Sequence, residues 1–223
     1  MPSMSLTTSQ DVLAAAEHLP SGATLVIHEF NWDDYEQLLE ALSKRPGLRV
    51  SYDSGRLEIL STSALHENFS RTVDLITYTF AELRGLNLQN YGSATWKSKA
   101  LGKGVEPDAC YYVENVGRVL GEEDIRLETH PPPDIAVEID ITNSSLRKLS
   151  IYAALSVPEI WRYDGRAFTF YTLREGKYLE IAESAQLPDL TGSMLLEALE
   201  DCRTRGPIVA LKAFRRLLRA AKR

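Results

Sequence analysis

The sequence has little cysteine and no long apolar run, and each shortage argues against a class of protein. Its two cysteines, Cys110 and Cys202, are far apart and form no CxxC pair, which argues against a disulfide scaffold. No stretch approaches the roughly 18 consecutive apolar residues of a membrane-spanning helix, and the N-terminal segment lacks the basic and apolar parts of a secretory signal. We therefore expect a reduced, cytoplasmic protein.

Several catalytic motifs are missing as well. The chain contains no GxSxG, no P-loop and no GxGxxG, which argues against a serine hydrolase and against the common nucleotide-binding and dinucleotide-binding sites. Its histidines share no ligand spacing, so a zinc site is not expected either; they are His18, His28, His66 and His130.

Positive charge is scarce except at the C-terminus. The formal net charge is −6, which argues against a protein dedicated to coating nucleic acid. Residues 203–223 hold eight Lys or Arg and no acid, while residues 1–202 hold 17 basic and 31 acidic side chains. We expect 1–202 to form one domain and 203–223 to form a basic amphipathic helix. That tail either docks on the acidic body or approaches a phosphate backbone.

The apolar spacing predicts an α/β fold with a mixed β-sheet flanked by helices. An initial helix, strand and helix form an N-terminal addition before the core. A long helix is expected over 65–85, and the β-branched run 134–141 reads as a central strand covered on both faces. The other expected strands cover 23–29, 48–53, 56–61, 88–91, 95–100, 108–113, 159–164, 167–173 and 177–182, and the last helix before the tail covers 192–200.

Two acids stand out because of the strands that carry them. Asp108 opens an apolar strand, and Glu138 lies inside DIAVEIDI. An unpaired buried carboxylate is costly, and a divalent cation held by both acids would satisfy both, since Mg²⁺ prefers oxygen ligands. The alternative is that Glu138 faces solvent or pairs with an arginine.

Three further residues extend this candidate site. Asp140 shares a strand face with Glu138, so two carboxylates on that face require a cation or a lysine. Lys148, on the helix that follows, can reach back to orient water or stabilise charge, unless it is simply a solvated lysine. Glu67 is a candidate third acid, and its neighbour His66 is a base, a phosphate contact or a surface residue.

Four segments together resemble the Uma family of restriction endonucleases, a bacterial branch of the PD-(D/E)XK nuclease superfamily. The resemblance runs from about residue 24 to residue 185 and is most specific in VPEIWRYD. The segments are HEN, VEPDACYYV, PPPDIAVEIDIT and LRKLSIYAALSVPEIWRYDG.

The resemblance implies a restriction-endonuclease-like core that hydrolyses DNA with Mg²⁺ or Mn²⁺. Asp108 matches the acid of the Pro-Asp motif, Glu138 the acid of the second motif, and Glu67 an accessory acid on the first core helix. The superfamily's lysine should stand two residues after Glu138, where this chain has Asp140. In some branches that lysine has moved to the next helix, and Lys148 is placed for this.

The presence of Asp140 at the usual lysine position leaves two functions open. The first is a metal-dependent endonuclease in which Asp108 and Glu138 hold the cation, Lys148 acts on water or charge, and Glu67 assists. The second is a catalytically silent nuclease-fold module that binds a nucleic-acid or protein partner. An exposed sheet edge and a hairpin near Gly165 also allow a homodimer.

Overall fold

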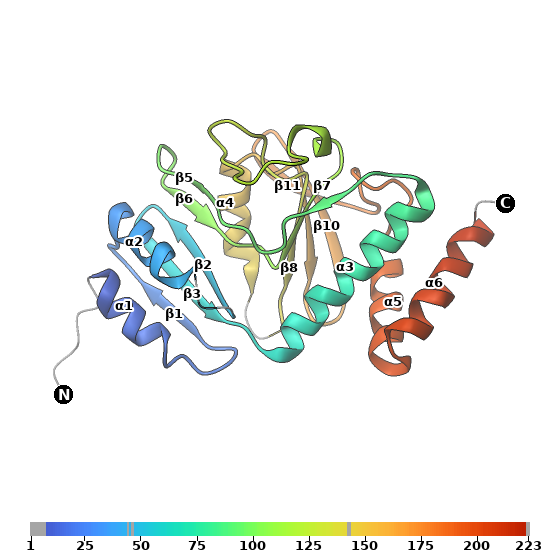
Figure 1. Ribbon diagram of the computed structural model, residues 1–223, viewed down its shortest axis with the longest axis horizontal. Coiled ribbons are helices and arrows are strands. Elements are labelled where there is room, and N and C mark those ends of the chain that lie inside the picture. The colour runs from blue at the N-terminus through green and yellow to red at the C-terminus, as the bar shows by residue number, and fades with distance from the viewer. Residues whose placement is uncertain (1–7, 44, 46, 142–143, 222–223) are drawn as a thin grey trace.

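The computed structural model describes residues 8–43, 45, 47–141 and 144–221. These residues form two β-sheets and the helices around them (Figure 1). The first described helix lies beside the first sheet, and the last described helix lies at the opposite end of the molecule. No helix in the described ranges is long and apolar enough to cross a membrane.

The first sheet is antiparallel throughout and carries the N-terminal addition. Its strand order is β1-β3-β2-β6-β5, with β1 at Thr24–Ile27, β2 at Leu48–Asp53, β3 at Arg56–Ser61, β5 at Trp96–Ser98 and β6 at Lys103–Val105. Helices α1 (Ser9–Ala16) and α2 (Trp32–Leu42) cover it and contribute Val12, Tyr35 and Leu38 to its core.

The second sheet is mixed and forms the centre of the molecule. Its order is β11-β10-β9-β8-β7-β4, and β8 pairs with β9 in parallel while the other pairs are antiparallel. The strands are β4 (Gln89–Asn90), β7 (Ala109–Tyr112), β8 (Ile135–Ile139), β9 (Glu159–Tyr163), β10 (Phe168–Arg174) and β11 (Lys177–Ile181).

Helices cover both faces of this second sheet. On one face lie α3 (Ala64–Arg84), α5 (Gly192–Arg205) and α6 (Pro207–Ala221). On the other lies α4 (Leu149–Ala154), preceded by the 3₁₀ turn η2 (Ser145–Lys148). A second 3₁₀ turn, η1 (Val116–Arg118), follows β7. Strand β8 is buried at every residue, as its near-continuous apolar sequence predicted.

Alternation along β8 decides which side chains reach the site. Ile135, Val137 and Ile139 pack on the α3 face, while Ala136 packs on the α4 face. Because successive strand side chains point to opposite faces, Glu138 shares the α4 face with Ala136.

The predicted α/β class and mixed sheet are confirmed, with two differences in detail. The expectation of one sheet was wrong, because β1, β2, β3, β5 and β6 form a sheet of their own. Strand β6 was missed because it has three residues and a central Gly104, which leaves too short a run for a periodic pattern. Gly104 is needed there, since a Cβ would overlap the Tyr35 side chain.

The basic tail is a helix that packs on the body. Leu211, Phe214 and Leu218 of α6 belong to the same core cluster as α3 and the second sheet. The predicted division at residue 202 falls inside α5, which continues to Arg205 before Gly206 separates it from α6. Docking, one of the two uses considered for the tail, is therefore what the described residues show.

This packing predicts that Phe214→Ala destabilises the whole protein. Phe214 is 5 % exposed, so its loss should lower the free energy of unfolding by about 3–5 kcal/mol. Leu217 of the same helix is 49 % exposed, and Leu217→Ala should cost below about 1 kcal/mol. Urea denaturation of both variants tests this, and equal small losses would mean that α6 is not packed on the body in solution.

Candidate active site

The backbone brings Asp108 and Glu138 together at the end of two paired strands. Ala109 of β7 is paired with Val137 of β8 in antiparallel register, so Asp108 comes opposite Glu138. The Asp108 amide donates to the Val137 carbonyl at 2.9 Å, and the Ile139 amide donates to Asp108 Oδ2 at 2.7 Å. The adjacent-strand placement expected for these acids is therefore present.

Glu138 is buried and held by two donors from the segment that follows β8. Lys148 Nζ lies 2.8 Å from Glu138 Oε2, and the Tyr152 hydroxyl donates to Oε1. Burial and the nearby Asp108 carboxylate raise the pKa of Glu138 to about 7, although the Lys148 ammonium opposes this. Glu138 therefore does not face outward, and among the described residues its ion-pair partner is a lysine and not an arginine.

Asp108 is buried among groups that favour its ionised form. His66 Nε2 lies 3.0 Å from Oδ2, and Arg49 Nε lies 3.7 Å from Oδ1. Burial acts to raise the pKa of Asp108, but the His66 contact and the Lys148 ammonium outweigh it and hold that pKa below its ordinary value. Within the described residues Oδ1 accepts no hydrogen bond, which leaves one carboxylate oxygen able to bind a ligand.

Lys148 is buried and reaches the site, so the reading of a solvated lysine was wrong. Ser144 caps the turn η2, its hydroxyl accepting from the Leu146 amide, and Lys148 ends that turn. Burial acts to lower the pKa of Lys148, but the carboxylates of Glu138 and Asp108 outweigh it and raise that pKa. The amine is therefore a fixed positive charge.

Asp140, which stands where the superfamily has its lysine, is satisfied by other partners. Arg162 Nε lies 2.6 Å from Asp140 Oδ2, and the Ser145 amide donates to both carboxylate oxygens. Each carboxylate on this strand face therefore has its own cationic partner. Lys148 pairs with Glu138, and Arg162 pairs with Asp140. Asp140 acts as an anchor for the start of η2.

Glu67 is linked to Asp108 only through Arg49 among the contacts of the described residues. Its carboxylate accepts from Arg49 at 2.7 Å and from the Thr62 hydroxyl at 3.4 Å, and its side chain is 35 % exposed. Arg49 therefore bridges Glu67 and Asp108. Glu67 does not line the cavity described next, and its assisting role stays a prediction.

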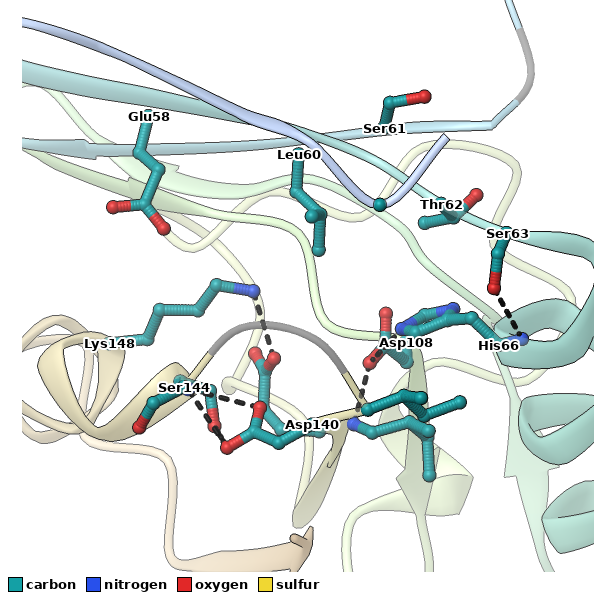
Figure 2. Close-up of a pocket in the computed structure, with 15 residues that line it drawn as sticks. Glu58, Leu60, Ser61, Thr62, Ser63, His66, Asp108, Asp140, Ser144 and Lys148 are labelled. Atoms are coloured by element: carbon teal, nitrogen blue, oxygen red, sulfur yellow. Dashed lines mark hydrogen bonds and ion pairs between the residues drawn. The ribbon is translucent and has the colours of Figure 1, made fainter. Parts of the chain in front are cut away.

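A cavity of about 20 Å³ lies between the two carboxylates and the first sheet. Figure 2 shows the Lys148 amine and the Asp108 carboxylate approaching it from opposite sides, with Leu60 of β3 across from them. Its lining includes Gly22, Ser61, His66, Asp108, Glu138, Asp140 and Lys148. The space suits one water molecule or one small cation.

The donors in this cavity fit a hard divalent cation better than a zinc ion. Four carboxylates line it, but those of Glu58 and Asp140 are paired with arginines, and one oxygen of Asp108 accepts no hydrogen bond in the described structure. No group of three His, Cys, Asp or Glu side chains placed to hold a metal occurs in the described ranges. Mg²⁺ tolerates so small a protein ligand set because it keeps several waters, whereas structural zinc sites take four protein ligands.

Sequence reasoning left two partners of the acids unassigned. The Tyr152 hydroxyl, on α4, holds Glu138. The spacing of four residues between Tyr152 and Lys148 puts both on one helix face. Arg49 lies on β2, and no local pattern links it to the site. The surface reading of His66 was wrong, because this residue is 5 % exposed.

A family model described as "Putative restriction endonuclease" matches residues 32–205, which include Asp108, Glu138 and Lys148. The chain belongs to the Uma2 family. No curated protein matches the sequence. Membership supports a nuclease function, and restriction-endonuclease-like proteins typically use divalent metals, in agreement with the oxygen donors around the cavity.

Proposed function

We propose that this Uma2 protein is an endonuclease that hydrolyses DNA phosphodiester bonds with bound Mg²⁺ or Mn²⁺. The observation that carries the proposal is the buried group of Asp108, Glu138 and Lys148, which face one small cavity with Lys148 Nζ 2.8 Å from Glu138. Burying three charged side chains together is costly for a fold, so a functional reason for their placement is favoured.

Asp108 and Glu138 would hold the cation. A bound Mg²⁺ would polarise a phosphate oxygen and lower the pKa of a coordinated water. His66 and the Ile139 amide fix the Asp108 carboxylate through Oδ2, which leaves Oδ1 toward the ligand. The Tyr152 hydroxyl holds Glu138 Oε1, and the Lys148 amine holds Oε2.

Lys148 would stabilise the negative charge that grows on the phosphate during cleavage. Its raised pKa keeps the amine protonated, so it acts as a cation and as a hydrogen-bond donor to water, not as a base. A fixed donor in a site with little water has a large effect on such a reaction because it needs no reorganisation.

Nicking of supercoiled plasmid tests the proposal. The wild type should nick plasmid with Mg²⁺ or Mn²⁺ and lose this activity in EDTA. Asp108→Asn should reduce the rate by at least about 100-fold, and Glu180→Gln, an exposed acid on β11, should cut like the wild type. An inactive wild type would refute the proposal, as would an Asp108→Asn variant that nicks as fast as the wild type.

A catalytically silent module is the competing function, and Asp140 in place of the usual lysine favours it. In that reading the buried acids are held by Lys148, Tyr152 and Arg162 as parts of the fold. Titration calorimetry separates the two functions, because Mn²⁺ binding that is lost in Asp108→Asn is expected from the nuclease alone.

A cytoplasmic location and a homodimer belong to the same proposal. Strand β11 is an edge of the second sheet, and its Leu179 is 56 % exposed, which leaves an edge to which a second copy can pair. Two active sites related by a two-fold axis would allow both strands of a duplex to be cut.

A further inference from the structure

The cavity that holds the two acids is too small for a nucleotide. Its volume of about 20 Å³ suits an ion or a water molecule. A scissile phosphate is joined to nucleotides on both sides, and these also need space. A substrate therefore needs a second, larger space that begins at the same residues.

Such a space lies on the other side of Lys148. A groove of about 270 Å³ runs between strands β2 and β3 of the first sheet and the segment η2–α4 of the second. Glu58 and Lys148 line both the groove and the small cavity, so the two adjoin at these residues. Figure 2 shows Glu58 above the Lys148 side chain.

Most charges along this groove are already neutralised. The Asp53 carboxylate pairs with Lys103, the Glu58 carboxylate with Arg56, and Lys148 with Glu138. Arg147 differs from them: it is exposed, it lines the groove, and its guanidinium has no ion pair in the part of the chain that is described. Arg147 precedes Lys148 on η2, and the start of η2 is held by hydrogen bonds from the Ser145 amide and hydroxyl to Asp140.

Other lining groups suit a nucleic-acid backbone. The hydroxyls of Ser51 and Ser150 border the groove, and Leu146, 52 % exposed, adds an apolar surface beside Arg147. Guanidinium groups bind phosphate through paired N–H donors, and an apolar side chain next to a cation can contact sugar carbons. Among the described residues the groove's own acids, Asp53 and Glu58, are paired with other cations.

We propose that this groove is the binding site for the DNA strand next to the cleaved bond, with Arg147 contacting a phosphate that flanks the scissile one. The choice of DNA as the ligand rests on the proposed nuclease function. Arg147 is assigned to binding, and the chemistry is left to Asp108, Glu138 and Lys148.

Binding is measured in EDTA, so that cleavage plays no part. Anisotropy of a short fluorescein-labelled DNA duplex is followed over a series of salt concentrations for the wild type and for Arg147→Ala. The variant should bind about five- to tenfold more weakly at 0.1 M salt, and the slope of log K against log[salt] should fall by about 0.9, the value for one lost phosphate contact.

Two variants serve as matched controls. Arg147→Lys keeps the charge and should lose less affinity than Arg147→Ala, with an unchanged salt slope. Arg174→Ala removes an equally exposed charge at the end of β10 remote from the site and should bind within about twofold of the wild type, since the groove is not touched.

Each other outcome overturns the inference. A wild type that does not bind the duplex refutes it, and so does an Arg147→Ala variant with unchanged affinity and slope, or equal losses in Arg147→Ala and Arg174→Ala. Plasmid nicking is scored separately. If binding depends on Arg147 but no nicking occurs, the groove proposal stands and the nuclease proposal is refuted. If the protein nicks plasmid but its binding does not depend on Arg147, the nuclease proposal stands and the groove proposal is refuted.

Discussion

Replacing Lys148 by methionine is expected to lower kcat for plasmid nicking by about 100- to 1,000-fold, the loss seen when one preorganised donor is removed from an active site. Methionine keeps the length of the side chain and removes its charge. Because Lys148 Nζ lies 2.8 Å from Glu138 Oε2, the amine is fixed before any substrate arrives, and its loss cannot be replaced by a mobile side chain.

The reason for so large an effect is the placement of the charge. Lys148 is 7 % exposed, so water screens its field weakly and its effect on a nearby phosphate is larger than that of a surface lysine. Mn²⁺ binding should survive in Lys148→Met, because Asp108 and Glu138 remain. A loss confined to kcat would then show that the lysine acts after the cation and the DNA are bound.

Two measurements make this result interpretable. Lys177→Met, at an exposed position on β11, should nick plasmid like the wild type. Calorimetry with Mn²⁺ should be performed above pH 7, where Glu138, with its pKa raised to about 7, is ionised. A Lys148→Met enzyme with wild-type kcat would place the catalytic cation elsewhere.

Much of this site was predictable because it depends on local patterns. Asp108 and Glu138 were found from acids inside apolar strands, and the two-residue period of a strand put Glu138 and Asp140 on one face. Lys148 was found from its place on the following helix. These relations involve residues close in sequence or on strands whose pairing the apolar runs define.

Apart from Tyr152 of α4, the parts that sequence reasoning missed involve the first sheet. Arg49 reaches Asp108 from β2, and Glu58 borders the cavity from β3. Their approach depends on how one sheet packs against the other, which is a property of the assembled fold and has no periodic signal. The same holds for β6, whose three residues pair with both β2 and β5.

Removing the Glu138 charge from the buried Lys148–Glu138 pair should lower the free energy of unfolding more than the loss of a surface ion pair does. Glu138→Gln is expected to lower the free energy of unfolding by about 3 kcal/mol, because it leaves the Lys148 ammonium buried without its nearest anion. Adding Lys148→Met should recover most of that loss, since a neutral pair needs no desolvated charge. The 2.8 Å contact between Lys148 Nζ and Glu138 Oε2 is the basis of both expectations.

The matched control is an exposed pair with the same geometry. Lys97 Nζ lies 2.7 Å from Glu36 Oε1, with side chains 39 % and 40 % exposed. Glu36→Gln should therefore cost less than about 1 kcal/mol, as solvent screens such pairs. Urea denaturation above pH 7, where Glu138 is ionised, compares the three variants. Equal costs for Glu138→Gln and Glu36→Gln would show that the Lys148 pair is hydrated in solution.

The pH dependence of the double variant gives an independent check. The folded-state pKa of Glu138 is raised from 4.5 to about 7, so this group's contribution to stability is present below pH 4.5 and is lost as the pH rises through 7. Asp108, with a lowered pKa, and Lys148, with a raised one, keep their charges across this window. Between pH 4.5 and 7 the wild type should therefore lose stability relative to Glu138→Gln/Lys148→Met. Parallel curves over that range would show that Glu138 ionises at its ordinary pKa, and that the buried carboxylate is stabilised more strongly than its surroundings indicate.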